Sequence, residues 1–464
     1  MVRWDVTLGK LVFKGFYPGW WPLFIPGISQ ALYLRVLLAV HYLAAGIIAV
    51  CHANRQFEGQ IALPLAAVSV FPMAFFNSHI SKTLAWPFMI LGAWALVDLY
   101  GGAERDVSRR VGISVGVAGG AMLLLANAYF AFYLAILAGC VFLASRAWVA
   151  TRTAAVSSVL VGAPKLISLI PVLLAGGRDA RVGYILTPAQ LISGLTGLWW
   201  DNGLVFDQVV NFEAYAVVGL PVCLFAVAAV GYAYLYPRQV DTRWIQGVLV
   251  AGIFGVLLAT QYKGIYAIPG VSIFRTARRA MILLGVGALL LAVAYLLVQD
   301  NTASKRRTQV LTALLVLSAA QGAIHPLSQS GQAAVEPTVG PKVAEKITSA
   351  GCERVWLENG YNGSRLQYRK EIGFALAERG VPVTAINYAK IGQEYRVRND
   401  SKLTFDALVF PEGTELPDNE TVTLEGGWGY PDRGTINASR FDVLTKVDTP
   451  AGELRIYAVD GRCE

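Results

Sequence analysis

Long apolar runs recur along most of the chain and set its organisation. A helix that crosses a membrane needs about 20 mostly apolar residues. The pattern therefore predicts an α-helical polytopic membrane protein with about ten spans. The predicted spans are 30–51, 60–78, 83–100, 111–128, 129–150, 154–176, 214–236, 244–260, 280–298 and 309–326.

Beyond residue 340 the chain alternates short apolar strands with amphipathic helices. Helices are predicted at 341–351 and 365–380, and a terminal hairpin at 441–459 that turns at Thr449–Gly452. Alternation of this kind predicts a small, mostly parallel sheet, and so an α/β domain after the membrane domain. The other predicted strands are 353–358, 381–387 and 405–410.

The stretches outside the spans define the domain boundaries. Residues 327–340 are rich in Ser, Gly, Pro and Gln and predict a linker. Segment 11–28 is apolar and aromatic but is interrupted by three prolines and Lys14, which indicates an interfacial element. We expect an outer juxtamembrane segment (1–29), a membrane domain (30–326), the linker and an α/β domain (341–464).

The charged residues support this division. They make up 15% of the chain, against about 25% in an average soluble domain. They number 35 among residues 1–340 and 35 among residues 341–464. This composition excludes an ordinary soluble enzyme for the first part. Five cysteines without a CxxC pair also argue against zinc ribbons and thioredoxin-like redox sites.

The basic residues of the loops predict an orientation. With the N-terminus outside, the inner loops carry 11 basic residues and the outer loops 7. The positive-inside rule favours this arrangement. It places the protein in the plasma (inner) membrane with an extracytoplasmic C-terminal domain. In an oxidising compartment Cys352 and Cys463, the two cysteines of that domain, are expected to form a disulfide.

Three arginines stand at the predicted outer start of one span. Arg275, Arg278 and Arg279 precede the apolar run 280–298. The start of a helix attracts anions, and arginine binds phosphate through its forked guanidinium. We interpret this group as a site for phosphate or pyrophosphate, with His79 and Lys82 as secondary candidates. The alternative is that the arginines extend toward lipid headgroups.

The outer loop 177–213 offers further polar and aromatic candidates. Trp199, Trp200 and Asp201 either stack on a sugar or anchor the loop at the membrane interface. Glu213 precedes a span, where a carboxylate complements the helix dipole and could contact an acceptor. The four histidines lack the spacing of metal ligands, so no metal site is expected. A divalent metal is neither required nor excluded, and no nucleic-acid partner is expected.

Five stretches in order carry a family resemblance. They are PGWWPLFIPG (18–27), LLAVHYLAAG (37–46), TLAWPFMILGAWAL (83–96), NFEAYAVVGLPVCLFAV (211–227) and IPGVSIFRTARRAMILLG (268–285). Their order resembles the YfhO-type family of polytopic membrane glycosyltransferases, within the GT-C superfamily. The resemblance implies transfer of a sugar from a polyprenyl-phosphate donor to an extracytoplasmic glycan or lipid acceptor.

The resemblance also implies roles for single residues. A general base takes the proton of the acceptor hydroxyl, and the matching carboxylate here is Asp5. Arg275 and Arg278 correspond to the residues that hold the donor phosphate, and Glu213 matches a family glutamate. In the family a span precedes the base, so we expect the natural chain to begin upstream of this sequence. The alternative for Asp5 is a solvated residue in a loose N-terminus.

Other functions remain open at this stage. A polysaccharide polymerase or ligase also handles lipid-linked pyrophosphate with outer arginines. A transporter predicts internal repeats and charges at the membrane midplane, which the sequence does not display. A catalytically inactive membrane scaffold of the same fold would account for the absence of a predicted span before Asp5.

Overall fold

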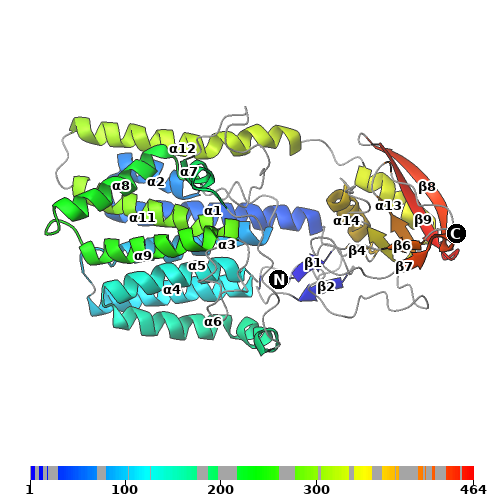
Figure 1. Ribbon diagram of the computed structural model, residues 1–464, viewed down its shortest axis with the longest axis horizontal. Coiled ribbons are helices and arrows are strands. Elements are labelled where there is room, and N and C mark those ends of the chain that lie inside the picture. The colour runs from blue at the N-terminus through cyan, green and yellow to red at the C-terminus, as the bar shows by residue number, and fades with distance from the viewer. Residues whose placement is uncertain are drawn as a thin grey trace. The chain divides into compact units, whose positions relative to one another are not determined.

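A computed structural model of the chain gives its architecture (Figure 1). The structure describes residues 2–5, 10–13, 18, 30–70, 80–102, 104–125, 127–174, 186–196, 217–260, 277–300, 305–333, 339–357, 368–381, 383–385, 406–410, 413, 421–423, 435–449 and 452–463.

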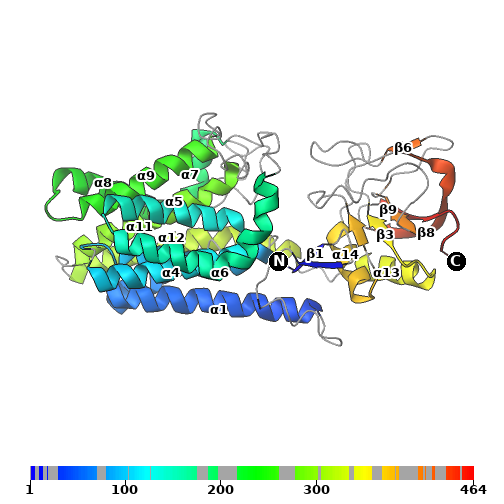
Figure 2. The ribbon, with the colours of Figure 1, turned by 90° about the horizontal axis from the view of Figure 1, so that it is seen from below.

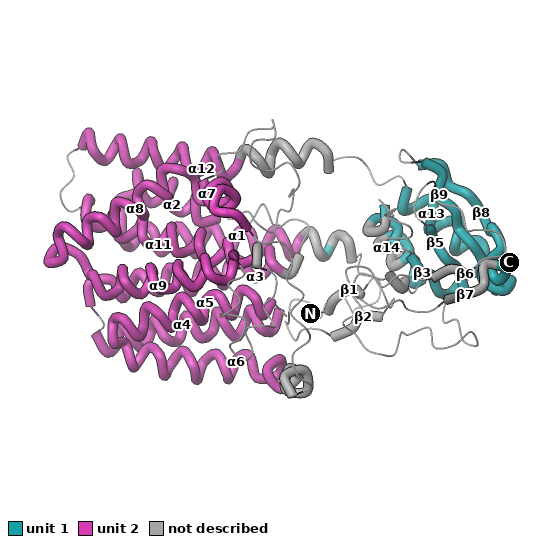
Figure 3. The backbone as a smooth tube through the Cα atoms, viewed as in Figure 1, with its two compact units in different colours: residues 1–14, 20–33, 333–464 teal, residues 15–19, 34–332 magenta. Residues whose placement is uncertain are grey.

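The chain divides into two compact units, shown in Figure 3. Unit 1 holds residues 1–14, 20–33 and 333–464, and unit 2 holds residues 15–19 and 34–332. The last helix of unit 2 continues to Ala333, so the first part of the predicted linker is helical.

Unit 2 is helical, and a helix lies in each of the ten segments predicted to span a membrane. Among the described residues, one further helix, α7 (Pro188–Thr196), lies in the predicted outer loop and was not predicted. The ten are α1 (Gln30–Gln56), α2 (Gly59–Val70), α3 (Ile80–Val97), α4 (Arg105–Leu124), α5 (Ala128–Ala144), α6 (Trp148–Leu174), α8 (Leu220–Leu235), α9 (Thr242–Ala259), α11 (Met281–Asp300) and α12 (Lys305–Ala333).

Four described helices are long and apolar enough to cross a membrane. They cover Val36–Gln56, Arg105–Leu124, Thr242–Ala259 and Met281–Gln299. Four others are apolar but shorter, with 10–17 residues. At 1.5 Å per residue such helices reach less than the roughly 30 Å of a hydrocarbon core. The structure thus has four candidate spans, and the predicted number of ten is not confirmed.

Helices α4 and α6 pack closely along a face of glycines and run side by side in Figures 1 and 2. Gly112, Gly116 and Gly120 recur every four residues on α4. A Cβ atom at Gly112 would lie 2.5 Å from the carbonyl oxygen of Ala150, and one at Gly116 would lie 2.5 Å from that of Ala154. Glycine therefore permits a backbone approach of the kind that small residues allow between membrane helices.

Buried indole groups find acceptors on neighbouring helices. Trp86 Nε1 donates to the carbonyl oxygen of Ser69 at 3.0 Å, and Trp94 Nε1 donates to the hydroxyl of Ser69 at 3.3 Å. Trp244 Nε1 donates to the carbonyl oxygen of Leu96 at 2.8 Å. A buried N–H without an acceptor would cost about 1–3 kcal/mol, so these bonds fix α2, α3 and α9 in register.

The C-terminal part of unit 1 is an α/β domain, as predicted, but its sheet is mixed and not mostly parallel, because the terminal hairpin adds two antiparallel strands. Its five-stranded sheet has the order β4-β3-β5-β9-β8. Strand β3 runs parallel to β4 and β5, β9 is antiparallel to β5, and β8 and β9 form the predicted hairpin between Thr449 and Gly452. The elements are α13 (Val339–Ser349), β3 (Val355–Leu357), α14 (Arg369–Glu378), β4 (Val383–Ala385), β5 (Ala407–Val409), β8 (Phe441–Thr449) and β9 (Gly452–Val459).

The described part of unit 1 also holds two small antiparallel ribbons. Strand β1 (Val2–Asp5) pairs with β2 (Lys10–Phe13), and β6 (Thr421–Thr423) pairs with β7 (Thr435–Asn437). The five-stranded sheet has a continuous apolar core that includes Val355, Ile456 and Ile372 of α14.

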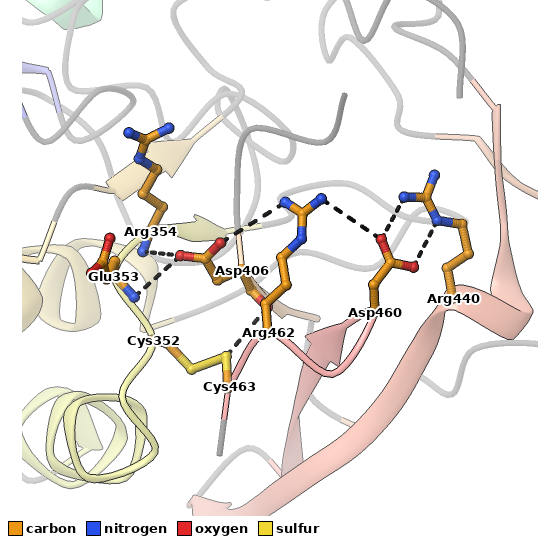
Figure 4. Close-up of polar contacts among 8 residues, drawn as sticks. All are labelled: Cys352, Glu353, Arg354, Asp406, Arg440, Asp460, Arg462 and Cys463. Carbon is orange, nitrogen blue, oxygen red and sulfur yellow. Dashed lines mark hydrogen bonds and ion pairs between the residues drawn. A yellow bond between two sulfur atoms is a disulfide. The ribbon is translucent and has the colours of Figure 1, made fainter. Parts of the chain in front are cut away.

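A disulfide closes the C-terminal domain, as predicted. Cys352 and Cys463 are bonded, with 4.9 Å between their Cα atoms. Figure 4 shows the polar contacts beside it. Asp406 accepts hydrogen bonds from the backbone N–H groups of Glu353 and Arg354, at 3.2 and 3.0 Å. The disulfide and this carboxylate both tie the start of β3 to later parts of the chain.

Candidate functional site

The start of helix α3 carries a buried cation. Lys82 is the third residue of α3, and 5% of its surface is exposed. One turn further along, the indole of Trp86 meets the ring of Phe130 edge-on, with 5.9 Å between the ring centroids. Phe130 is the third residue of α5. The starts of α3 and α5 therefore lie beside each other.

A second cation reaches the start of α5 from a distant part of the sequence. Tyr129 precedes Phe130, and the guanidinium carbon of Arg279 lies 4.4 Å from the centroid of the Tyr129 ring. This is a cation–π contact, which gains strength where the guanidinium is shielded from water. Arg279 belongs to the 3-10 turn η5 (Ala277–Ala280), directly before α11. We call Lys82, Tyr129 and Arg279 the cationic cluster.

The local sequence explains why the helices begin here. Asn127 caps α5, because its side-chain oxygen accepts a hydrogen bond from the backbone N–H of Phe130 at 3.3 Å. The first N–H groups of a helix lack intrahelical acceptors, and the helix dipole adds partial positive charge at that end. Lys82 and Arg279 thus stand at the starts of α3 and α11, two helices that contact each other and α5. The arrangement favours a bound anion such as a phosphate.

The structure describes two of the four residues predicted to hold a donor phosphate. Lys82 lies in the cationic cluster, and the backbone of Arg278 lies in η5 next to Arg279. Arg275 and His79 lie outside the described residues, as do the acceptor candidates Trp199, Trp200, Asp201 and Glu213.

The predicted general base lies in unit 1. Asp5 is the last residue of β1, and its backbone pairs with Lys10 of β2. The prediction that it acts as a base stays a prediction.

Sequence reasoning missed the aromatic part of the cluster. Arg279 stood out as one of three arginines, but its partner Tyr129 belongs to a different predicted span. An aromatic residue two positions after a capping asparagine was the available signal. It did not indicate which cation the ring would meet.

A second polar group lies at the opposite end of α3 and serves the packing of the helices. The side-chain amide of Gln56 donates to Asp98 at 3.2 Å. Asp241 accepts from the backbone N–H of Gly101 at 3.3 Å and caps α9 by accepting from that of Trp244 at 3.0 Å. Each carboxylate therefore joins neighbouring helices, which accounts for its presence there.

Among the described residues, no group of three or more His, Cys, Asp and Glu side chains is placed to hold a metal ion.

No protein-family model matches the chain, and no curated protein matches it. A functional conclusion has to be argued from the chemistry of the site.

Proposed function

We propose that the protein is a membrane glycosyltransferase that moves a sugar from a polyprenyl-phosphate donor to an extracytoplasmic glycan or lipid acceptor. The observation that carries the proposal is the cationic cluster, in which Lys82 is buried and Arg279 lies on the ring of Tyr129. A cluster of this kind at the end of an apolar helical unit suits a ligand with a phosphate head and a hydrocarbon tail. The family resemblance of the sequence motifs points to the same substrate.

The proposed chemistry assigns the phosphate to the cations. Lys82 and Arg279 hold the donor phosphate, together with Arg275 and Arg278, and neutralise the charge that develops on it as the sugar leaves. The acceptor hydroxyl attacks the anomeric carbon, and the bond from that carbon to the phosphate oxygen breaks. A carboxylate removes the hydroxyl proton, for which Asp5 is the candidate.

The proposed orientation follows from the disulfide and the charge pattern. A disulfide between Cys352 and Cys463 suits an oxidising compartment. We therefore propose a multi-pass plasma (inner) membrane protein of about ten spans, with the C-terminal domain extracytoplasmic. The shorter helices would cross a locally thinned bilayer or be completed by flanking residues. The positive-inside rule supports the same orientation.

The test is sugar transfer by the purified full chain with a panel of polyprenyl-phosphate sugars. The variant Lys82→Met should lower kcat/KM roughly ten- to hundredfold, because it removes a charge-assisted hydrogen bond to phosphate. Arg279→Ala should cause a loss of similar size, and Asp5→Asn should abolish transfer. The matched control is Arg110→Gln, which removes an exposed cation near the opposite end of the helical unit and should stay within about twofold.

Size-exclusion profiles of each variant separate loss of activity from loss of folding. Transfer that persists in Lys82→Met and Arg279→Ala would overturn the role of the cationic cluster. If the whole panel gives no transfer while the protein still binds a lipid pyrophosphate, the protein is instead a polysaccharide polymerase or ligase. Absence of both transfer and binding would indicate an inactive scaffold.

A further inference from the structure

Sequons for asparagine-linked glycans occur in the chain in an uneven way. A sequon is Asn-x-Ser/Thr with x other than proline. The chain has six asparagines among residues 1–340 and six among residues 341–464. None of the first six begins a sequon, whereas four of the second six do: Asn362, Asn399, Asn419 and Asn437.

Composition does not explain this distribution. Serine and threonine number 29 among residues 1–340 and 13 among residues 341–464, which is close to one residue in ten in both parts. At that density six asparagines would give less than one sequon. All four sequons fall in the part of the chain that also contains the disulfide between Cys352 and Cys463.

The structure describes the surroundings of one sequon, Asn437-Ala438-Ser439. Asn437 is the last residue of β7, and the chain then makes the 3-10 turn η9 (Ala438–Arg440). Ser439 in this turn is exposed. The hydroxyl residue that defines the sequon is therefore on the surface, as the bulk of a glycan requires.

The turn that carries the sequon is anchored to the sheet through its last residue, Arg440, which Figure 4 shows beside Asp460. Arg440 Nε donates to a carboxylate oxygen of Asp460 at 2.8 Å. The backbone N–H of Asp460 donates to the carbonyl oxygen of Arg440 at 2.9 Å. The sequon thus stands at a defined position at the end of β9, with Ser439 exposed.

A second sequon is brought to the same end of the β6–β7 ribbon. The backbone of Thr421, the hydroxyl residue of Asn419-Glu420-Thr421, pairs with that of Asn437. The first residue of β6 thus faces the last residue of β7. The hydroxyl residue of one sequon therefore lies opposite the asparagine of another at the open end of one ribbon, whereas Asn419 itself lies outside the described residues.

We infer that Asn437 is a glycosylation site, modified by an oligosaccharyltransferase that uses a lipid-pyrophosphate-linked glycan. A bond forms between the side-chain nitrogen of Asn437 and the anomeric carbon of the glycan. The bond from that carbon to the pyrophosphate breaks, and the lipid pyrophosphate leaves with the proton that the amide loses. The inference rests on the outer placement of the C-terminal domain proposed above and is independent of the glycosyltransferase activity.

The experiment measures site occupancy in protein isolated from its native membranes. Trypsin releases the heptapeptide 434–440, which contains this sequon alone, and the nearby peptide 447–455, which contains none. Isotope-labelled standards give the molar ratio of unmodified heptapeptide to reference peptide. We expect a ratio below one half, together with heavier forms of the heptapeptide that release sugar fragment ions.

Two variants control the measurement. Ser439→Ala destroys the sequon and should restore the ratio to one, whereas Ser439→Thr keeps the sequon and should leave the ratio low. A ratio of one in the natural protein would overturn the inference.

The same digest shows whether Cys352 and Cys463 are bonded, because the bond links the peptides 347–354 and 463–464. An intact bond indicates that the domain lies in an oxidising compartment. An unmodified heptapeptide beside intact disulfide peptides would overturn glycosylation and leave the outer placement standing. An unmodified heptapeptide with both cysteines reduced would overturn the outer placement and the glycosylation together.

Discussion

At the scale of single residues, the contact between Arg440 and Asp460 makes the end of β9 sensitive to acid. The hydrogen bond from Arg440 lowers the pKa of Asp460 below its ordinary value. A carboxyl group with a lowered pKa in the folded state contributes stability above its unfolded pKa of about 3.9. That contribution is lost as the pH falls through the folded pKa, because protonation then weakens the contact.

Hydrogen exchange of the peptide that contains Asp460 measures this effect. After correction for the intrinsic exchange rate, protection should be constant above about pH 5 and fall below about pH 4. Arg440→Gln should lower the protection above about pH 5 and flatten its fall below about pH 4, because Asp460 then has a pKa closer to its unfolded value and contributes less pH-dependent stability. Arg455→Gln is the matched control, since Arg455 pairs with Glu453 on the same hairpin. An unchanged pH profile in Arg440→Gln would contradict the assignment.

At the scale of elements, the glycine face of α4 sets the distance to α6. In Gly116→Ala, the new Cβ atom would lie 2.5 Å from the carbonyl oxygen of Ala154, so the helices must separate. Overpacking of this kind costs about 1–3 kcal/mol, and we expect a lower thermal unfolding midpoint in detergent.

The matched control for this substitution is Gly139→Ala in α5. No atom lies within 4 Å of a Cβ atom at Gly139. Because alanine favours helix by up to about 1 kcal/mol over glycine, this variant should be as stable as the natural chain or slightly more stable. Equal midpoints for the two variants would mean that α4 and α6 do not pack tightly at Gly116.

The sequence predicted the helices well because apolar runs are local signals. Each of the ten predicted segments contains a helix. Helix ends were less predictable, since α4 starts at Arg105, six residues before the predicted segment 111–128. Helix α7 was missed because, with nine residues, it is too short to give an apolar run of the length of a membrane span. Tertiary contacts such as that between Arg279 and Tyr129 lie beyond the reach of local patterns.

At the scale of the whole molecule, charge density predicted the division of the chain. The sparse charges before residue 340 and the dense charges after it correspond to a helical unit and an α/β domain. The pairing of Cys352 with Cys463 was also predictable, because they are the two cysteines of that domain. The number of membrane-spanning helices was not predictable in the same way, because hydropathy does not determine how far each helix extends.

The proposed orientation makes a prediction about thiol accessibility in intact cells. A membrane-impermeant maleimide should label no cysteine before reduction, because Cys352 and Cys463 are bonded to each other. After an impermeant reductant it should label these two. Cys51 is exposed, but it lies near the end of α1 that the orientation assigns to the inner side, so it should stay unlabelled.

The double variant Cys352→Ser/Cys463→Ser identifies the labelled residues, since it should take up no label in intact cells. The positive-inside rule and the disulfide both support an outer C-terminal domain, and they are independent arguments. The rule depends on the basic residues of the inner loops, whereas the disulfide depends on an oxidising compartment. Labelling of Cys352 and Cys463 that requires permeabilised cells would place the C-terminal domain inside. That result would reverse every assignment of inner and outer loops, and it would move the cationic cluster to the cytoplasmic side of the membrane.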